Sequence, residues 1–235
     1  MQTNNFLMKL ILASFLTLTL AKPVMAFTVD NLVQFSEQDG KTIIYTLNNN
    51  GEEDLYVNTI VNELVIDDDG SIEEREYNSD NVDEWKTSLS LNKFILRSGE
   101  IKKITLTKID SNLTSNEDEV YMVRFSPVKV ASDENELSVS YGYGVLSVIE
   151  TKVESEGKPI VEFNKELLTV KNDSNRFLAV KVCGSTESAY TCPTKGFLIP
   201  GRVKDFELSE EELKHENLRV VVSSNDGSIQ YENIF

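Results

Sequence analysis

Apolar and polar residues alternate with a period of two along much of the chain after residue 26. In the first half these runs are short, rich in β-branched and aromatic residues, and separated by turn-forming clusters such as Asn48–Gly51. They lie at Phe27–Val29, Leu32–Phe35, Lys41–Leu47, Leu55–Ile66, Lys93–Leu96, Ile101–Thr107 and Val120–Phe125. The sequence between them has no amphipathic pattern of helical length, so this half is predicted to be a β-sandwich.

A second set of strands follows the polar segment 151–159, which contains Gly157 and Pro159 and is predicted to be a linker. These strands are expected at Ile160–Phe163, Leu167–Val170, Phe177–Val182, Phe197–Gly201, Asp205–Leu208, Leu218–Val222 and Ile229–Tyr231. The clearest helix signal is Ser209–Lys214, where Ser209 and Glu212 have the spacing of a capping box. The chain is therefore predicted to be all-β, with two sandwich domains at 27–150 and 160–235.

The segment Leu137–Ile149 alternates over the greatest length. Its odd positions are apolar or aromatic except Ser147, whereas its first four even positions are serine or glycine. A strand of this length is long against the usual five or six residues. It is either an ordinary core strand at the end of a domain, or a strand whose first half leaves its own sheet and pairs with another chain.

Residues 1–26 have the pattern of a secretory signal peptide. Lys9 precedes an apolar run, and Val24-Met25-Ala26 supplies the small or branched residues found before a cleavage site. We expect cleavage after Ala26, with export of a mature protein that is not inserted in a membrane. The alternative is an uncleaved anchor, although the apolar run is too short to span a bilayer comfortably.

The chain of 235 residues is strongly acidic. It has 23 Lys and Arg against 39 Asp and Glu, a formal net charge of −16. Cleavage would remove Lys9 and Lys22, which leaves 21 basic and 39 acidic residues and a charge of −18. This charge argues against nucleic-acid binding, and the acidic stretch 67–84 is expected to be a solvated loop.

Candidate chemistry is sparse. One His and two Cys are too few for a zinc site built from nitrogen and sulfur ligands. We find neither a phosphate-binding loop nor a nucleophile motif, so enzyme activity, a metal and a cofactor are not expected. Because the protein is exported, Cys183 and Cys192 are predicted to form a disulfide that staples a hairpin of the second domain.

Several of these segments resemble the periplasmic chaperones of chaperone–usher pilus pathways. Tyr45–Gly51 is similar to the family's strand B and its turn, Phe94–Leu106 to its apolar hairpin, and Glu119–Phe125 to its strand F. Leu137–Ile149 is similar to its strand G. The run from Phe177 to Gly201 is similar to the second domain of the alternate-pathway chaperones, which serve colonisation-factor and common-pilus fimbriae.

The resemblance implies two immunoglobulin-like domains in an L or boomerang, and a periplasmic location. It also implies that strand G donates its apolar row to a pilin that lacks one strand, and that the chaperone delivers the pilin to an outer-membrane usher. By position, Leu137, Val139 and Tyr141 would face the pilin, Tyr143 would lie at the transition, and Val145 onward would pack in the chaperone's own core. An unoccupied edge of this kind can also pair with a second copy of the chain.

Conventional members of the family hold the pilin's terminal carboxylate with an Arg and a Lys. The matching positions here are Val33 and Leu146, which cannot bind an anion. Arg124 is the first candidate for a replacement because it lies in an otherwise apolar strand, and Lys103 and Arg97 are the next. The competing expectation for Arg124 is that a neighbouring acid neutralises it.

Two other functions fit parts of the sequence. A pilus subunit or adhesin would also be exported and built from immunoglobulin-like domains, but it would carry its donor segment near the mature N-terminus. A secreted enzyme with β-sandwich domains would need a catalytic constellation that the sequence does not offer.

Overall fold

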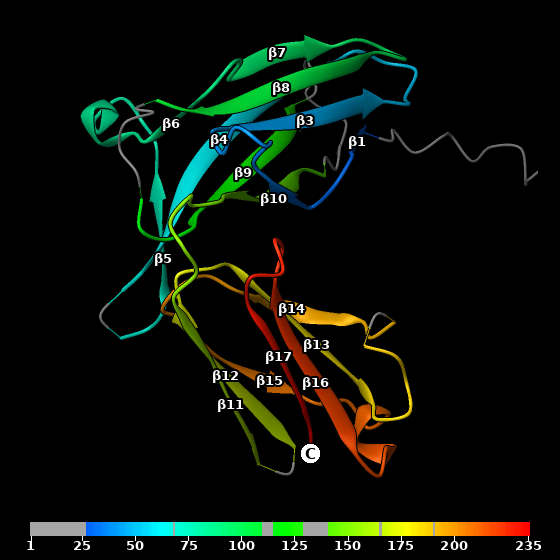
Figure 1. Ribbon diagram of the computed structural model, residues 1–235. Coiled ribbons are helices and arrows are strands. Elements are labelled where there is room, and N and C mark those ends of the chain that lie inside the picture. The colour runs from blue at the N-terminus through cyan, green and yellow to red at the C-terminus, as the bar shows by residue number, and fades with distance from the viewer. Residues whose placement is uncertain (1–26, 68, 110–114, 129–140, 165, 190) are drawn as a thin grey trace, which may run out of the picture.

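The computed structural model describes residues 27–67, 69–109, 115–128, 141–164, 166–189 and 191–235, and these fold into two β-sandwiches (Figure 1). One sheet of the first sandwich has the strand order β1 (Phe27–Val29), β3 (Thr42–Asn49), β8 (Ile101–Lys108) and β6 (Thr87–Leu89). The other has the order β2 (Val33–Phe35), β10 (Tyr143–Ile149), β9 (Glu119–Val128), β4 (Leu55–Ile66) and β5 (Ile72–Glu76), with β7 (Lys93–Leu96) also paired to β4.

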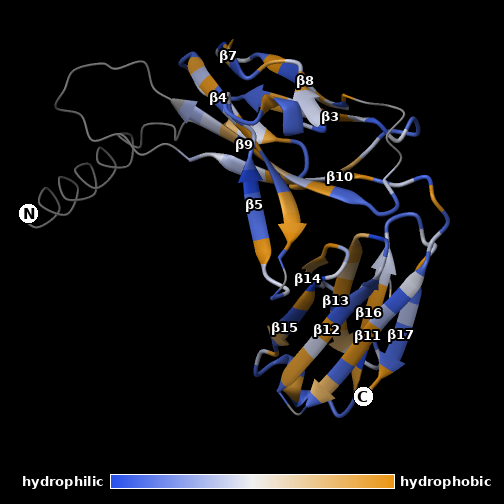
Figure 2. Ribbon diagram, turned by 90° about the vertical axis from the view of Figure 1, so that its left-hand side faces the viewer, coloured by the Kyte–Doolittle hydropathy of each residue, from blue (hydrophilic) through white to orange (hydrophobic). Residues whose placement is uncertain are grey.

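The second sandwich begins at Gly157. Its smaller sheet contains β11 (Gly157–Asn164), β12 (Leu167–Ser174) and β15 (Val203–Glu207). Its larger sheet contains β14 (Thr194–Leu198), β13 (Leu178–Gly184), β16 (Leu218–Ser224) and β17 (Gln230–Ile234). The strands of the two sandwiches run in different directions, and the β4–β5 hairpin points from the first sandwich toward the second (Figures 1 and 2). No helix in the described part of the chain is long and apolar enough to cross a membrane.

Alternation in sequence becomes alternation in burial. Each sandwich has its own apolar core, and the largest fully buried side chains, Tyr45, Tyr121 and Phe125, all lie in the core of the first. The hydroxyls of Tyr45 and Ser147 are 2.6 Å apart, so the polar residue in the otherwise apolar row of β10 has a buried partner. Burial raises the pKa of Tyr45, which keeps its hydroxyl protonated and able to donate in this pair.

Three expectations are corrected by the backbone. The stretch 67–84 is not wholly a loop, because Ile72–Glu76 pairs with β4 through the main chain while its four charged side chains stay exposed. Gly157 to Pro159 belong to β11 rather than to the linker, since they pair with Asn172–Ser174 of β12. Of the long strand expected at 137–149, residues 137–140 lie outside the described residues, Tyr141 and Gly142 are not in a strand, and Tyr143–Ile149 form β10.

The expected helix at Ser209–Lys214 is a single 3-10 turn, η3 (Glu212–Lys214). The capping box is nevertheless present, because the Ser209 backbone N–H donates to the Glu212 carboxylate at 2.6 Å and the Glu212 N–H donates to Ser209 Oγ at 3.3 Å. Glu212 also binds Lys195 at 2.5 Å, which fastens the turn to β14. The six-residue segment is too short for the cap to propagate a helix.

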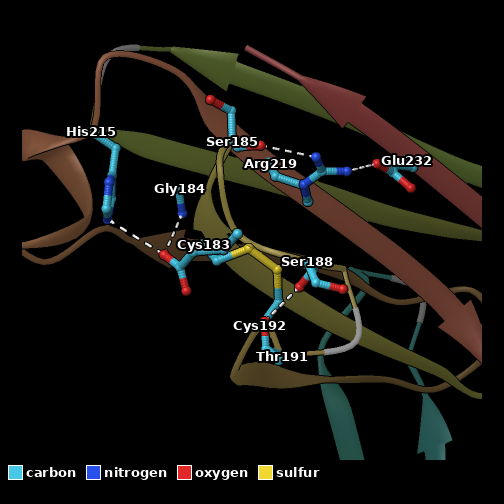
Figure 3. The surroundings of a disulfide bond; sticks show 10 residues. Cys183, Gly184, Ser185, Ser188, Thr191, Cys192, His215, Arg219 and Glu232 are labelled. Carbon is cyan, nitrogen blue, oxygen red and sulfur yellow. Dashed lines mark hydrogen bonds and ion pairs between the residues drawn. A yellow bond between two sulfur atoms is a disulfide. The ribbon is translucent and has the colours of Figure 1, made fainter.

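The predicted disulfide is confirmed. It joins Cys183, in β13, to Cys192, in the loop that leads to β14, with 5.2 Å between the two Cα atoms (Figure 3). Hydrogen bonds order the closed loop from within, since the Gly184 N–H donates to the Glu187 carboxylate and the Thr191 hydroxyl donates to the Ser188 carbonyl (Figure 3). The bond therefore closes a compact loop at one end of the second sandwich.

Replacing both Cys183 and Cys192 by Ala should lower the free energy of unfolding by about 2.5–3 kcal/mol, the loop-closure value for a ring of this size. The effect should be confined to the second sandwich, because both cysteines belong to it. Urea titration of the double variant and of the reduced wild type measures the loss. Equal midpoints for oxidised and reduced wild type would contradict the prediction.

Candidate functional site

The strand β10 has an open edge next to the start of β2. Among the described residues, β2 pairs with β10 only at Leu146–Val148, whereas β9 pairs with it from Tyr143 onward. The Leu146 N–H donates to the Leu32 carbonyl at 2.9 Å, so the main chain of alternate residues points to that edge. Gly144 therefore directs its N–H and C=O to the position that β2 leaves vacant.

The row of large side chains on β10 runs from the core into solvent. Val145, Ser147 and Ile149 are buried in the first sandwich. Tyr143 is half-buried and packs on Phe27, with 5.4 Å between ring centroids. Tyr141, the next residue of the row, is 77% exposed. An apolar row that continues past its own sheet is suited to enter the core of another chain.

Leu137 and Val139 lie outside the described residues, so the structure describes only the second half of the expected donor row. Tyr143 is the first residue of β10 and the last to pair with β9, and Tyr141 lies two residues before it, outside the strand.

The opposite face of β10 turns toward the second sandwich. Here Val120, Val148 and Leu64 pack against Phe177 and Ile199 in an apolar cluster. Val33 and Leu146 belong to the partly buried border of this cluster and lie opposite each other in register. The two positions that match the carboxylate-binding Arg and Lys of conventional family members are thus adjacent, and both are apolar.

Arg124 is the only basic residue that the described parts of β2, β10, β9, β4 and β5 place on this face. One of its terminal nitrogens donates to both oxygens of Glu74, at 2.9 and 2.6 Å. The two side chains are 37% and 40% exposed, so the pair is accessible to solvent. Glu74 is thus the neighbouring acid that, in the competing expectation, neutralises Arg124.

The other two candidate cations lie elsewhere. Lys103 is exposed on β8, which belongs to the opposite sheet, and Arg97 is exposed in the turn between β7 and β8. That turn lies at the end of the first sandwich remote from the second (Figure 1). The structure therefore does not bring the three candidates together, and only Arg124 faces the side on which the sandwiches meet.

A buried polar cluster, which no sequence pattern indicated, joins the two sandwiches. The Asp118 carboxylate accepts the N–H groups of Phe177 at 2.7 Å and Thr151 at 2.9 Å, and Arg176 lies 3.4 Å away. Arg176 also donates to the carbonyls of Thr151 at 2.8 Å and Val153 at 2.6 Å. Burial raises the pKa of Asp118, while these donors oppose the shift.

Phe177 continues this junction as an aromatic stack. It meets Phe35 of β2 edge-on at 5.9 Å and stacks on Phe197 of β14 at 5.5 Å, measured between ring centroids. The apolar and polar contacts together fix the second sandwich beneath the same strands that carry the open edge and Arg124.

Comparison with solved structures identifies the class of fold. The chain superposes on the class 5 fimbriae chaperone CfaA with a TM-score of 0.55 and 20% identity, over 89% of this chain and 98% of the other. It also superposes on a chain from the complex of the Salmonella enterica SafA pilin with the SafB chaperone, with a TM-score of 0.58 and 10% identity, over 92% and 98% of the two chains. The resemblance to pilus chaperones and the predicted fold of two immunoglobulin-like sandwiches are confirmed.

Sequence comparison is more specific. The family model described as the CS5 fimbrial protein N-terminal domain matches residues 29–149, just over half of the chain. An uncharacterised 25.9 kDa protein from the CS5 3′ region of Escherichia coli is 31% identical over 168 residues, which cover 68% of this chain and 71% of that protein. The chain belongs to this CS5 fimbrial protein family.

Proposed function

We propose that the protein is a periplasmic pilus-assembly chaperone that caps pilin subunits by donor-strand complementation and delivers them to an outer-membrane usher. The observation that carries the proposal is the apolar row of β10, which leaves the core at Tyr143 and reaches solvent at Tyr141, beside an open main-chain edge. A strand added there gains main-chain hydrogen bonds and inserts alternate side chains into the partner's core.

In this proposal, different segments of the chain have different roles. We infer that residues 1–26 direct export, that 27–150 form the domain that offers the donor strand, and that 160–235 form the second domain. Leu137, Val139 and Tyr141 would enter the pilin, and Tyr143 would lie at its boundary. The structural similarity to a chain from the complex of the SafA pilin with the SafB chaperone supports a pilin as the partner.

We further propose that Arg124 binds the pilin's terminal carboxylate. An incoming strand parallel to β10 must end where β2 begins, which is opposite Gly144, and Gly144 lies opposite Arg124 in register. Neighbouring strands are about 4.8 Å apart, so the end of that strand would lie about 9.6 Å from the Arg124 main chain. An extended arginine side chain and one hydrogen bond can span this distance.

Affinity isolation of the mature protein from the periplasm of fimbriated cells, followed by mass spectrometry, tests the function. A chaperone should carry a small β-rich exported subunit at one-to-one stoichiometry. Recovery of the protein in high-mass, SDS-resistant fibres of itself would instead favour the pilus-subunit function. Recovery of the protein alone, from cells shown to make pili, would contradict both functions.

A further inference from the structure

We infer that Glu74 acts as an internal stand-in for the partner's carboxylate: it holds Arg124 while the β10 edge is empty and yields it, across Gly144, when a strand docks. This inference rests on the proposed function. It adds to that function a residue, Glu74, that competes with the partner's carboxylate for Arg124, and a route for the arginine across Gly144. Both follow from the order and register of β10, β9, β4 and β5.

Arg124 lies two strand spacings from Glu74 on one side and from a docked strand on the other. The sheet order is β10, β9, β4, β5, so the arginine on β9 crosses β4 to reach Glu74 on β5. A strand added beyond β10 would also be two strands away from β9, on the opposite side. The Arg124 and Glu74 side chains span the first gap together, and an extended arginine with one hydrogen bond spans the second.

Gly144 places no side chain between Arg124 and the open edge. A Cβ built on Gly144 would lie 3.0 Å from Met122 Sδ and 4.0 Å from Arg124 Cγ. Met122 Sδ therefore lies against Gly144, and this flexible thioether must move aside for the guanidinium to pass toward the open edge. A branched residue at this position would fill the route that the guanidinium must take.

The ion pair between Arg124 and Glu74 is open to solvent. One terminal nitrogen of Arg124 makes both described bonds to Glu74, and the pair is more than one-third exposed. Such a pair is weak and exchangeable. It nevertheless keeps a cation satisfied on a largely apolar face, and a carboxylate delivered in register by a bound strand can replace it without leaving Arg124 unpaired.

The matched variants are Glu74→Gln and Glu76→Gln. Both residues are on the same face of β5 and both changes remove one negative charge, but only Glu74 contacts Arg124. The probe is the subunit recovered with the wild-type protein, unfolded in guanidinium chloride and diluted into each variant. A second version of that subunit carries a C-terminal amide in place of its α-carboxylate.

Glu74→Gln should bind the carboxylate subunit about two- to fivefold more tightly than wild type, the range expected when an exposed competing ion pair is lost. Glu76→Gln should bind it as wild type does. Arg124→Gln and Gly144→Val should each weaken binding by roughly tenfold, as expected for one charge-assisted contact. All of these variants should bind the amide subunit alike.

The possible results distinguish failure of the proposed Glu74 role from failure of the proposed chaperone function. Equal binding by Glu74→Gln and Glu76→Gln would overturn the stand-in role, while capture by wild type would leave the chaperone function in place. Equal loss of the carboxylate and amide subunits in Gly144→Val would mean that strand docking itself is damaged, and would overturn the route across Gly144. A wild-type protein that captures no subunit would overturn the function and the inference together.

Discussion

Replacing Tyr141 by Asp should abolish capture of the pilin while leaving the chaperone folded. Tyr141 is 77% exposed in the free protein, so its own sandwich loses little when the ring is removed. In the proposed complex the ring is buried in the partner, which is worth about 1.5–3 kcal/mol, and an aspartate there would also have to lose its water. We expect the affinity to fall by more than about 100-fold.

Tyr56→Asp is the matched control, because Tyr56 is another exposed tyrosine, on β4. Both variants should show the circular dichroism spectrum and the melting temperature of the wild type. Only Tyr141→Asp should lose the subunit in affinity isolation and in dilution refolding of the unfolded pilin. Capture of the pilin by Tyr141→Asp at wild-type affinity would show that the row on β10 is not the donor.

The sequence predicts the fold well where burial alternates. The predicted strand Leu55–Ile66 coincides with β4, which is paired on both sides and lies mostly in the core. The odd positions of Leu137–Ile149 were expected to turn into the core from Val145 onward, and Val145, Ser147 and Ile149 are buried. In these strands the side chains alone carry the information about which face is inside.

The strand β5 could not be predicted from an alternation of apolar and polar residues. Four of its five residues are charged, and none of them is buried. Its place in the sheet depends on main-chain pairing with β4, which leaves no hydrophobic pattern to read. Because Glu74 is on this strand, the sequence could identify Arg124 as unusual but could not identify the acid that neutralises it.

The junction between the sandwiches was missed for a related reason. Asp118 and Arg176 are far apart in the chain, and each lies just before a strand whose apolar residues give the stronger sequence pattern. Phe177 was expected at the start of a core strand, whereas it packs in the cluster shared by the two sandwiches. Only the fold brings these residues together, since no local spacing connects them.

Asp118→Ala should be among the most destabilising single changes outside the two cores. The Asp118 side chain is 3% exposed and Arg176 is 8% exposed. Removing the carboxylate leaves the N–H groups of Thr151 and Phe177 without their acceptor and takes the nearest negative charge from the buried Arg176 guanidinium, which should cost about 3–5 kcal/mol. Asp173→Ala is the control, because Asp173 is 58% exposed in its pair with Lys171 and should cost less than about 1 kcal/mol.

The loss should appear as uncoupling of the two sandwiches. Asp118 and Arg176 connect the first sandwich to the start of β13, so without them each sandwich should unfold in its own urea transition. Small-angle scattering of the native variant should also give a larger radius of gyration than the wild type. A single transition with the wild-type midpoint would show that the aromatic stack on Phe177 is sufficient to hold the junction.

The pH dependence of stability, compared between the wild type and a third variant, Asp118→Asn, tests how the junction is stabilised. Burial raises the pKa of Asp118 above its ordinary value, so the folded protein binds the Asp118 proton more tightly than the unfolded chain does. The stability that this proton contributes is complete below the unfolded pKa, about 3.9, and is lost as the pH rises through the folded value. The difference in free energy of unfolding between wild type and Asp118→Asn should therefore shift in favour of the wild type toward acid pH. A shift in the opposite direction would mean that the donors from Arg176, Thr151 and Phe177 outweigh burial, and that the carboxylate is held at this junction in its charged form.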